Sequence, residues 1–393
     1  MTSRGAFELR VLTPAGAPER VRRSAEIRSS AHGSRELWFE IRGADASTVN
    51  ERADPFVLPA LLRAMDLGCD LSVRGAPVDA RFLRNLAEFQ RIWSAWFGFE
   101  RVAVEAETLE STPSSALGIV AFSGGVDSAF SAWWHTRGDA RRERRIAAAM
   151  MVRGIDIPIT DPAAFESAGA RSRRMAESVG LEFLTVTTNA WILPPAVRSF
   201  TGPGVISALH LLAGQFGAGL VPSTATYRDL VVPLNSSPVS DPLLGSSGFE
   251  IAHDGAYYSR FEKLTFLVQW PEAMDSLRVC LVHPRHDRNC GVCDKCMLTL
   301  AELRVIGVEP ACFERSPTAD ELVAWARRLP RRGIFLSEAA VIVREAAERD
   351  VVEPWVRALA RRIRTENLKQ GVLAAWPALA DTRARVARRF RQT

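Results

Sequence analysis

The sequence predicts an α/β protein in three parts: an α+β unit, a central domain with a parallel sheet, and a helical carboxy-terminal region. Strand-like and helix-like segments alternate through the middle of the chain, as expected when helices connect parallel strands. Mixed elements precede this segment, and apolar residues at helical spacing follow it. With 393 residues, 47% of them hydrophobic, the chain can fill several cores. We expect the boundaries at 1–112, 113–312 and 313–393.

The first part combines alternating strands with amphipathic helices. In order, its predicted elements are strands Phe7 to Leu12 and Leu37 to Ile41, helices Pro59 to Leu67 and Ala80 to Phe97, and strand Arg101 to Ala106. Residues 111–115, rich in serine, threonine and proline, follow the last strand. Such a stretch is typical of a linker and marks the first boundary.

The central part begins with Leu117 to Phe122, an apolar run typical of a strand buried on both faces. The predicted elements that follow are helix Ser128 to Thr136, strand Ile146 to Val152, helix Asp161 to Val179, strand Leu181 to Thr187, helix Val205 to Phe216, strand Gly219 to Pro222 and helix Leu264 to Gln269. Asp161 and Gly180 flank the second of these helices as its start and stop signals. This alternation predicts a parallel sheet.

The third part begins with a capping box, Thr318 to Glu321, and continues with predicted helices Glu338 to Arg349, Pro354 to Leu368 and Pro377 to Arg391. The net charge of the whole chain is +5, but residues 319–393 alone carry an excess of seven positive charges. These arginines could contact nucleic acid. We favour solvated faces of amphipathic helices, so a nucleic-acid partner is not the preferred interpretation.

Two negative observations bear on location. No run reaches the roughly 18 apolar residues of a membrane span. The first ten residues lack the apolar core of a secretory signal. We therefore expect a cytoplasmic protein with no membrane partner. The sequence leaves the oligomeric state open, a homodimer included.

The segment Ser123-Gly-Gly-Val-Asp-Ser128 lies between a predicted buried strand and a predicted helix. The adjacent glycines, Gly124 and Gly125, allow backbone N–H groups to point at one anion, where the next helix presents its positive dipole end. Serine hydroxyls can donate to the same anion, and the Asp127 carboxylate suits Mg²⁺. The segment predicts a phosphate-binding turn.

This segment resembles the signature of the N-type ATP pyrophosphatases, the PP-loop superfamily. The resemblance implies an ATP-binding domain in which a substrate oxygen attacks the α-phosphorus, pyrophosphate leaves, and a nucleophile then displaces AMP. The positions that the resemblance assigns to ATP and Mg²⁺ are Ser123, Gly124, Gly125, Val126, Asp127 and Ser128, with Asp127 as the Mg²⁺ ligand. Met151, at the end of the second predicted strand, resembles the family's adenine-contacting stretch, although core packing is an equally good account of it.

A second motif consists of four cysteines, Cys280, Cys290, Cys293 and Cys296. Two-residue gaps in a tight turn let thiolates point at one tetrahedral centre, so we expect a structural Zn²⁺ site. A [4Fe–4S] cluster is the alternative occupant. The cluster is similar to the zinc site of 7-cyano-7-deazaguanine synthase, which converts a carboxylate to an amide and then a nitrile with ammonia and ATP. That resemblance covers roughly Gly118 to Ala301.

Between the two motifs, Lys263 and Arg260 are candidate catalytic residues. A lysine ammonium suits a phosphate as a point charge, so both side chains are expected to meet the pyrophosphate or the charge developing on the α-phosphate. An exposed helix salt bridge is the alternative for Lys263. Ligands of open α/β sheets bind beyond strand ends. The candidate substrate contacts there, with plain turn residues as the alternative, are Ser223, Thr224, Tyr227 and Asp241.

These motifs predict an ATP-dependent ligase that forms a carbon–nitrogen bond. It would adenylate a carboxylate or amide oxygen of a small, deazapurine-like substrate for attack by a nitrogen donor. ATP and Mg²⁺ are the expected cofactors of the reaction, and Zn²⁺ is expected as a structural ion. Two alternatives stay open: a tRNA- or nucleic-acid-modifying enzyme that transfers sulfur, and a scaffold that binds nucleotide without turnover.

Overall fold

The computed structural model describes residues 6–17, 20–29, 33–138, 144–193, 200–280, 282–329 and 334–365. The chain divides into two compact units. Unit 1 comprises Met1–Cys290 and Pro310–Glu314, and unit 2 comprises Gly291–Glu309 and Arg315–Thr393. The helix expected at Pro377 to Arg391 lies outside the described residues.

Within the described residues, eleven strands of unit 1 form one sheet. They are β1 (Ala6–Val11), β2 (Ala15–Ala17), β3 (Arg20–Ser29), β4 (Gly33–Arg42), β5 (Asp70–Arg74), β7 (Val104–Glu105), β9 (Leu117–Ala121), β10 (Arg145–Arg153), β11 (Glu182–Thr188), β12 (Ala218–Pro222) and β13 (Glu250–Asp254). Two further strands, β6 (Val78–Asp79) and β8 (Thr108–Leu109), pair with each other.

Five neighbouring strands, in the order β11-β10-β9-β12-β13, are parallel throughout. In chain order this arrangement is 3-2-1-4-5, which confirms the predicted α/β class and parallel sheet and is compatible with a Rossmann-like fold. The strand order reverses between β9 and β12. Ligands of open α/β sheets bind at such a reversal, outside the carboxyl ends of the strands.

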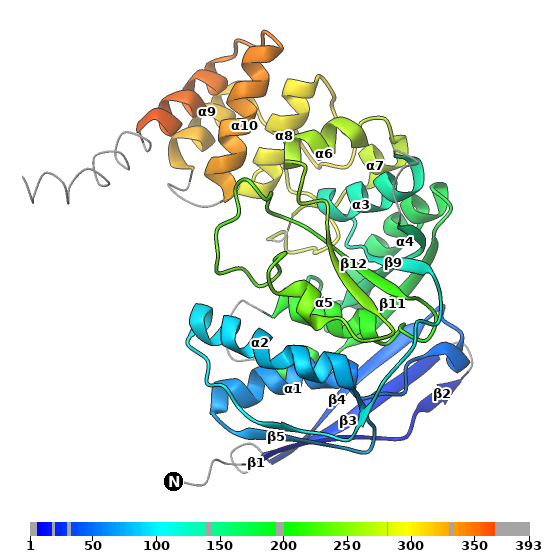
Figure 1. The fold of residues 1–393 in the computed structure, drawn as a ribbon. Coiled ribbons are helices and arrows are strands. Elements are labelled where there is room, and N and C mark those ends of the chain that lie inside the picture. Colours follow the sequence, from blue (N-terminus) through cyan, green and yellow to red (C-terminus); the bar gives the residue numbers. More distant parts are fainter. Residues whose placement is uncertain are drawn as a thin grey trace, which may run out of the picture. The chain divides into compact units, whose positions relative to one another are not determined.

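Helices cover both faces of the sheet of unit 1 (Figure 1). They are α1 (Asp54–Leu67), α2 (Ala80–Phe97), α3 (Val126–Arg137), α4 (Pro162–Ser178), α5 (Thr201–His210), α6 (Arg260–Leu267) and α7 (Pro271–Ser276). Short 3-10 turns occur at η1 (Ala46–Thr48), η2 (Ala190–Ile192) and η3 (Asp241–Leu244). Helices α3 and α4 pack on one face of the parallel strands and α5 on the other, where α1 contacts it.

The amino-terminal strands continue the parallel sheet. Strand β4 pairs antiparallel with β11, and β3, β1, β5 and β7 follow it in order. One continuous core of buried side chains includes Phe39 and Phe56 from the amino-terminal part and Leu184 and Leu209 from the central part. The described residues between 6 and 112 and the parallel strands therefore share one sheet and one core.

Several elements differ from their sequence prediction. Strands β5 and β13 and helices α7 and α8 were not predicted, the strand expected at Arg101 to Ala106 is only β7, and α6 begins at Arg260 rather than at Leu264. Two further differences have a local physical reason. Strand β3 was not predicted, because Arg23 interrupts its apolar alternation although that side chain is only 2% exposed. Helix α5 ends at His210 rather than at Phe216. The chain after it approaches other backbone closely, since a Cβ on Gly214 would lie 2.1 Å from the carbonyl oxygen of Thr48. That approach leaves room only for glycine at this position, and residues 211–215 form turns instead of helix.

Unit 2 is helical. It contains α8 (Asp294–Ile306), α9 (Ala319–Arg328), α10 (Ile334–Glu348) and helical residues 354–365. The capping box predicted at Thr318 and Glu321 is present at the start of α9, and Trp325 and Trp355 are fully buried. None of the helices in the described part of the chain is long and apolar enough to cross a membrane.

Candidate functional site

The glycine turn lies where the strand order reverses, directly after β9. Gly124 has φ +76°, a conformation that an L side chain rarely adopts, and a Cβ there would lie 2.8 Å from Ser172 Oγ of α4. Gly125 is the N-cap residue of α3, so no side chain caps the start of this helix. The Ser128 hydroxyl donates to the Gly125 carbonyl at 3.1 Å and lies 3.4 Å from the Ser123 hydroxyl. The turn therefore places the backbone of two glycines at the positive end of α3, the kind of position that an anion prefers.

Aromatic packing brings α6 against α3. On α3, Phe130 and Trp134 lie one turn apart and stack with ring centroids 5.6 Å apart. Phe266 of α6 approaches both rings, at 5.8 and 5.2 Å, and Tyr258 contacts the same pair at 5.2 and 5.1 Å. Such pairs stabilise beyond the area they bury. The capping box of Ser259 with Glu262 begins α6 at this position and so fixes the side chains that follow.

This packing places Lys263 against Asp127. Lys263 Nζ donates to Asp127 Oδ1 at 2.8 Å and to the Ser223 carbonyl oxygen at 2.5 Å. Lys263 is 1% exposed, so it is not part of an exposed helix salt bridge. Arg260 Nη1 lies 3.8 Å from Asp127 Oδ2. Three charged groups predicted as catalytic thus meet at the first turn of α3, and a buried ammonium of this kind needs such partners.

A further cation, Arg278, lies beside the glycine turn. Its backbone N–H donates to the Gly124 carbonyl oxygen at 2.8 Å, and its Cβ is 4.0 Å from where a Cβ of Gly124 would be. The guanidinium is 3.6 Å from Asp156, and burial lowers the pKa of Arg278 although Asp156 opposes this. Its Nε is buried and has no hydrogen-bond partner in the described part of the chain.

The candidate substrate residues separate into two groups. Ser223 follows β12 and is buried, and its carbonyl oxygen accepts the hydrogen bond from Lys263. Thr224, next to it, is exposed. Tyr227 is 59% exposed. Asp241, in contrast, is 1% exposed and accepts from His253 Nδ1 at 2.8 Å, from Ser236 Oγ and from a backbone N–H, a network that occupies both of its oxygens.

Of the residues assigned to the nucleotide, Gly124, Val126, Ser128 and Met151 are buried, and two of them have apolar side chains. Val126 is 1% exposed at the first position of α3, so its contribution to a ligand is its backbone. Met151 is 2% exposed in β10, opposite Thr185 of β11. Its side chain packs in the interior, which matches the core-packing account of this position.

The four cysteines of the second motif lie together. Their sulfur atoms are all within 4.8 Å of one another, and Cys280 Sγ is 3.6 Å from Cys290 Sγ. A tetrahedral Zn²⁺ with bonds of about 2.3 Å separates its sulfur ligands by roughly 3.8 Å. Cys280 and Cys296 are buried, and the other two are partly exposed. The group can therefore hold a metal such as zinc.

Local hydrogen bonds fix the cysteine segment. Asn289 is 2% exposed, and its Oδ1 accepts from the backbone N–H groups of Val279 and Cys280 at 2.8 and 3.2 Å. Its Nδ2 donates to the Leu277 and Cys312 carbonyls. Gly291 has φ +72°, and a Cβ there would lie 2.2 Å from the Arg315 carbonyl oxygen, so the tight turn requires glycine.

Sequence reasoning missed Arg278, Ser172 and the aromatic contacts of α6. Arg278 precedes Cys280 by two residues, yet nothing in that spacing relates it to the glycine turn. A signal did exist for the aromatic contacts: Asp127, Phe130 and Trp134 recur at the spacing of one helix face.

Comparison of this chain with protein-family models, with curated proteins and with solved structures gave no significant match.

Proposed function

We propose that the protein is an ATP pyrophosphatase of the PP-loop type, an enzyme that cleaves ATP between its α- and β-phosphates. An oxygen of a carboxylate or amide substrate attacks the α-phosphorus, and pyrophosphate leaves. A nitrogen nucleophile such as ammonia then attacks the activated carbon, AMP leaves, and a proton is released. The product would be an amide or a nitrile, as in 7-cyano-7-deazaguanine synthase, which the sequence motifs resemble.

The observation that carries the proposal is the meeting of Lys263 with Asp127 at the glycine turn. These residues are 136 positions apart, and the packing of α6 on α3 brings the buried ammonium to the helix start beside two glycines. A fixed positive charge in a site with little solvent stabilises the negative charge that develops on a phosphate group in the transition state of its transfer. Lys263, with Arg260 on the same helix, supplies that charge in the proposed reaction.

The Asp127 carboxylate is a suitable ligand for Mg²⁺. Mg²⁺ in such enzymes is held by one or two carboxylates together with substrate phosphates. The Asp127 side chain is 20% exposed, and its Oδ2 lies 3.8 Å from Arg260 Nη1. Magnesium would neutralise phosphate charge there. Lys263 orients the carboxylate through Oδ1, and Arg278 holds the turn by its bond to the Gly124 carbonyl.

We assign the cysteine cluster to a structural zinc ion, because four thiolates close the coordination shell and leave no position for a substrate. Sulfur transfer is the less favoured reaction. It needs a thiolate outside the cluster, and burial raises the pKa of the Cys312 thiol to about 12.

The test is incubation of the full chain with Mg·ATP, ammonium and a panel of purine and deazapurine carboxylates, with nucleotides separated by chromatography. The proposal expects AMP and pyrophosphate in equal amounts, and only with an acceptor present. Formation of ADP and phosphate would contradict it. Binding of ATP with no AMP from any acceptor would favour the scaffold alternative.

A further inference from the structure

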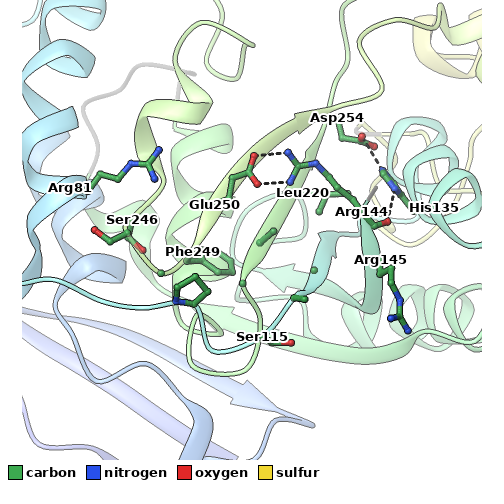
Figure 2. A pocket seen from close by; sticks show the side chains of 17 residues that line it. Arg81, Ser115, His135, Arg144, Arg145, Leu220, Ser246, Phe249, Glu250 and Asp254 are labelled. Carbon is green, nitrogen blue, oxygen red and sulfur yellow. Dashed lines mark hydrogen bonds and ion pairs between the residues drawn. The ribbon is translucent and has the colours of Figure 1, made fainter. Parts of the chain in front are cut away.

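The charged side chains of unit 1 differ in how well they are paired. In the wall of a cavity of about 640 Å³, Arg144 Nη1 donates to Glu250 Oε2 at 2.6 Å, and His135 Nε2 lies 3.0 Å from Asp254 Oδ1 (Figure 2). These groups satisfy one another without a ligand. Arg278, at the glycine turn, is a buried cation with weaker contacts.

The backbone of Arg278 is fixed beside Gly124. Its N–H donates to the Gly124 carbonyl oxygen at 2.8 Å, and the next N–H, that of Val279, donates to Asn289 Oδ1 at 2.8 Å. A Cβ on Gly124 would lie 2.8 Å from Ser172 Oγ and 4.0 Å from Arg278 Cβ. The glycine therefore keeps a space open between α4 and the stem of this arginine.

The guanidinium of Arg278 has few acceptors. Its side chain is 4% exposed, and Nε is buried with no hydrogen-bond partner in the described part of the chain. Nη1 donates to the His286 carbonyl oxygen at 3.3 Å, a long bond, and Nη2 lies 3.6 Å from Asp156 Oδ2, beyond normal hydrogen-bond distance. Buried charges are normally paired and hydrogen-bonded. This guanidinium is therefore short of an anionic acceptor.

The position of the guanidinium favours phosphate as that acceptor. The glycine turn follows β9 and Asp156 follows β10, its parallel neighbour, so Arg278 spans two loops at the carboxyl edge of the sheet. Ligands of open α/β sheets bind at this edge, and phosphates bind at helix starts such as that of α3. Guanidinium groups match phosphate oxygens in geometry and charge.

Lys263 and Arg278 approach the turn from opposite sides of β9. Lys263 donates to the Ser223 carbonyl after β12, whereas Arg278 reaches Asp156 after β10, and these two strands flank β9. The attacking and leaving oxygens of a phosphoryl transfer are roughly in line. Because candidate substrate residues follow β12, the side of β10 is left for the leaving group.

We propose that the Arg278 guanidinium binds the pyrophosphate end of ATP at the glycine turn and holds the pyrophosphate as it leaves. The inference rests on the proposed ATP reaction and adds a cation to it from the chain after α7. Asp156, whose side chain is 32% exposed, is solvated by water when Arg278 pairs with the ligand.

The experiment is calorimetric titration of the full chain with ATP, pyrophosphate and AMP, each with Mg²⁺. Arg278→Gln keeps the backbone N–H and with it the bond to Gly124. Loss of charge-assisted hydrogen bonds should weaken pyrophosphate binding about tenfold to a hundredfold and leave AMP binding within about twofold of wild type. Arg278→Lys keeps a cation without the planar donors, so it should weaken pyrophosphate binding at least about threefold. It decides the question if Arg278→Gln does not fold.

Asp156→Asn separates this role from a structural one. It removes the carboxylate beside the guanidinium, so pyrophosphate binding should stay unchanged or become tighter. Arg23→Gln, which removes a buried arginine of β3, is the control for lost stability and should bind as wild type does.

Three results would overturn the inference while the proposed function stands. They are wild-type pyrophosphate binding by the folded Arg278 variants, an equal loss of AMP binding, and a loss in Asp156→Asn as large as that in Arg278→Gln. Wild-type protein that binds neither ATP nor pyrophosphate would contradict the proposed function and this inference together.

Discussion

Replacement of Lys263 by methionine removes the cation at the centre of the proposed site while it keeps most of the apolar stem. The ammonium makes two hydrogen bonds, to Asp127 and to the Ser223 carbonyl, in a position that is 1% exposed. A preorganised charge of this kind contributes a factor of about 10² to 10³ in kcat, or roughly 3 to 4 kcal/mol. We expect pyrophosphate release by Lys263→Met to fall by that factor.

The stability cost should be smaller. Loss of one partner from a fully buried pair costs about 3 to 5 kcal/mol, but Asp127 keeps contact with solvent and with Arg260. We expect the free energy of unfolding, measured with urea, to fall by about 1 to 3 kcal/mol. The enzyme would stay folded, so activity per folded molecule can be measured.

Arg23→Met is the matched control. It removes another buried cation, 2% exposed, whose Nη2 donates to the Glu51 carbonyl at 2.7 Å in the amino-terminal part. Pyrophosphate release per folded molecule should stay within about twofold of wild type, because no charge near the turn changes. The reasoning fails if Lys263→Met releases pyrophosphate at the wild-type rate, or if both variants lose activity equally.

Three further predictions concern the turn, the metal and acid stability. Gly124→Ala should reduce ATP turnover at least tenfold by crowding Ser172, while Gly180→Ala, with similar φ and no neighbour within 4 Å, should retain it in the same assay. Purified protein should contain one zinc per chain by mass spectrometry, and Cys290→Ser should lose it; brown colour with iron would contradict zinc. Burial raises the pKa of Asp79, but hydrogen bonds lower it more, to about 2 from 3.8. The Asp79 carboxylate therefore stabilises the fold above about pH 4, and this stabilisation is lost as the pH falls towards 2. The difference in free energy of unfolding between wild type and Asp79→Asn, measured with urea, should shrink by about 2 kcal/mol between pH 5 and pH 2. A difference that stays constant with pH would contradict this.

Local signals in the sequence predicted much of the fold. Helix α2 has the predicted bounds, Ala80–Phe97, because its apolar residues recur on one face and Asp79 caps it. The glycine turn follows a buried strand, as predicted. An apolar run followed by two glycines is typical of a buried strand that ends in a turn. The spacing of the four cysteines was enough to predict that their sulfur atoms lie together. In each case the determining residues lie close in the sequence.

Contacts between distant segments were not predictable in the same way. The pairing of β4 with β11 joins the amino-terminal strands to the parallel sheet, and no residue pattern in either strand specifies its partner. Strand β3 contains a buried arginine, which periodicity treats as exposed. Lys263 was singled out for its chemistry, but its place beside Asp127 depends on the packing of α6 against α3. Arg278 reaches the turn through backbone geometry that composition does not reveal.

The most direct test of the central claim is the identity of the phosphorus products. Wild-type protein would be incubated with Mg·ATP, ammonium and the small-molecule fraction of a cell extract as the source of acceptors, and followed by ³¹P NMR. Cleavage at the glycine turn between the α- and β-phosphates predicts AMP and pyrophosphate, with both signals lost in Lys263→Met. Appearance of ADP and inorganic phosphate, or of AMP at the same rate in Lys263→Met, would contradict the account.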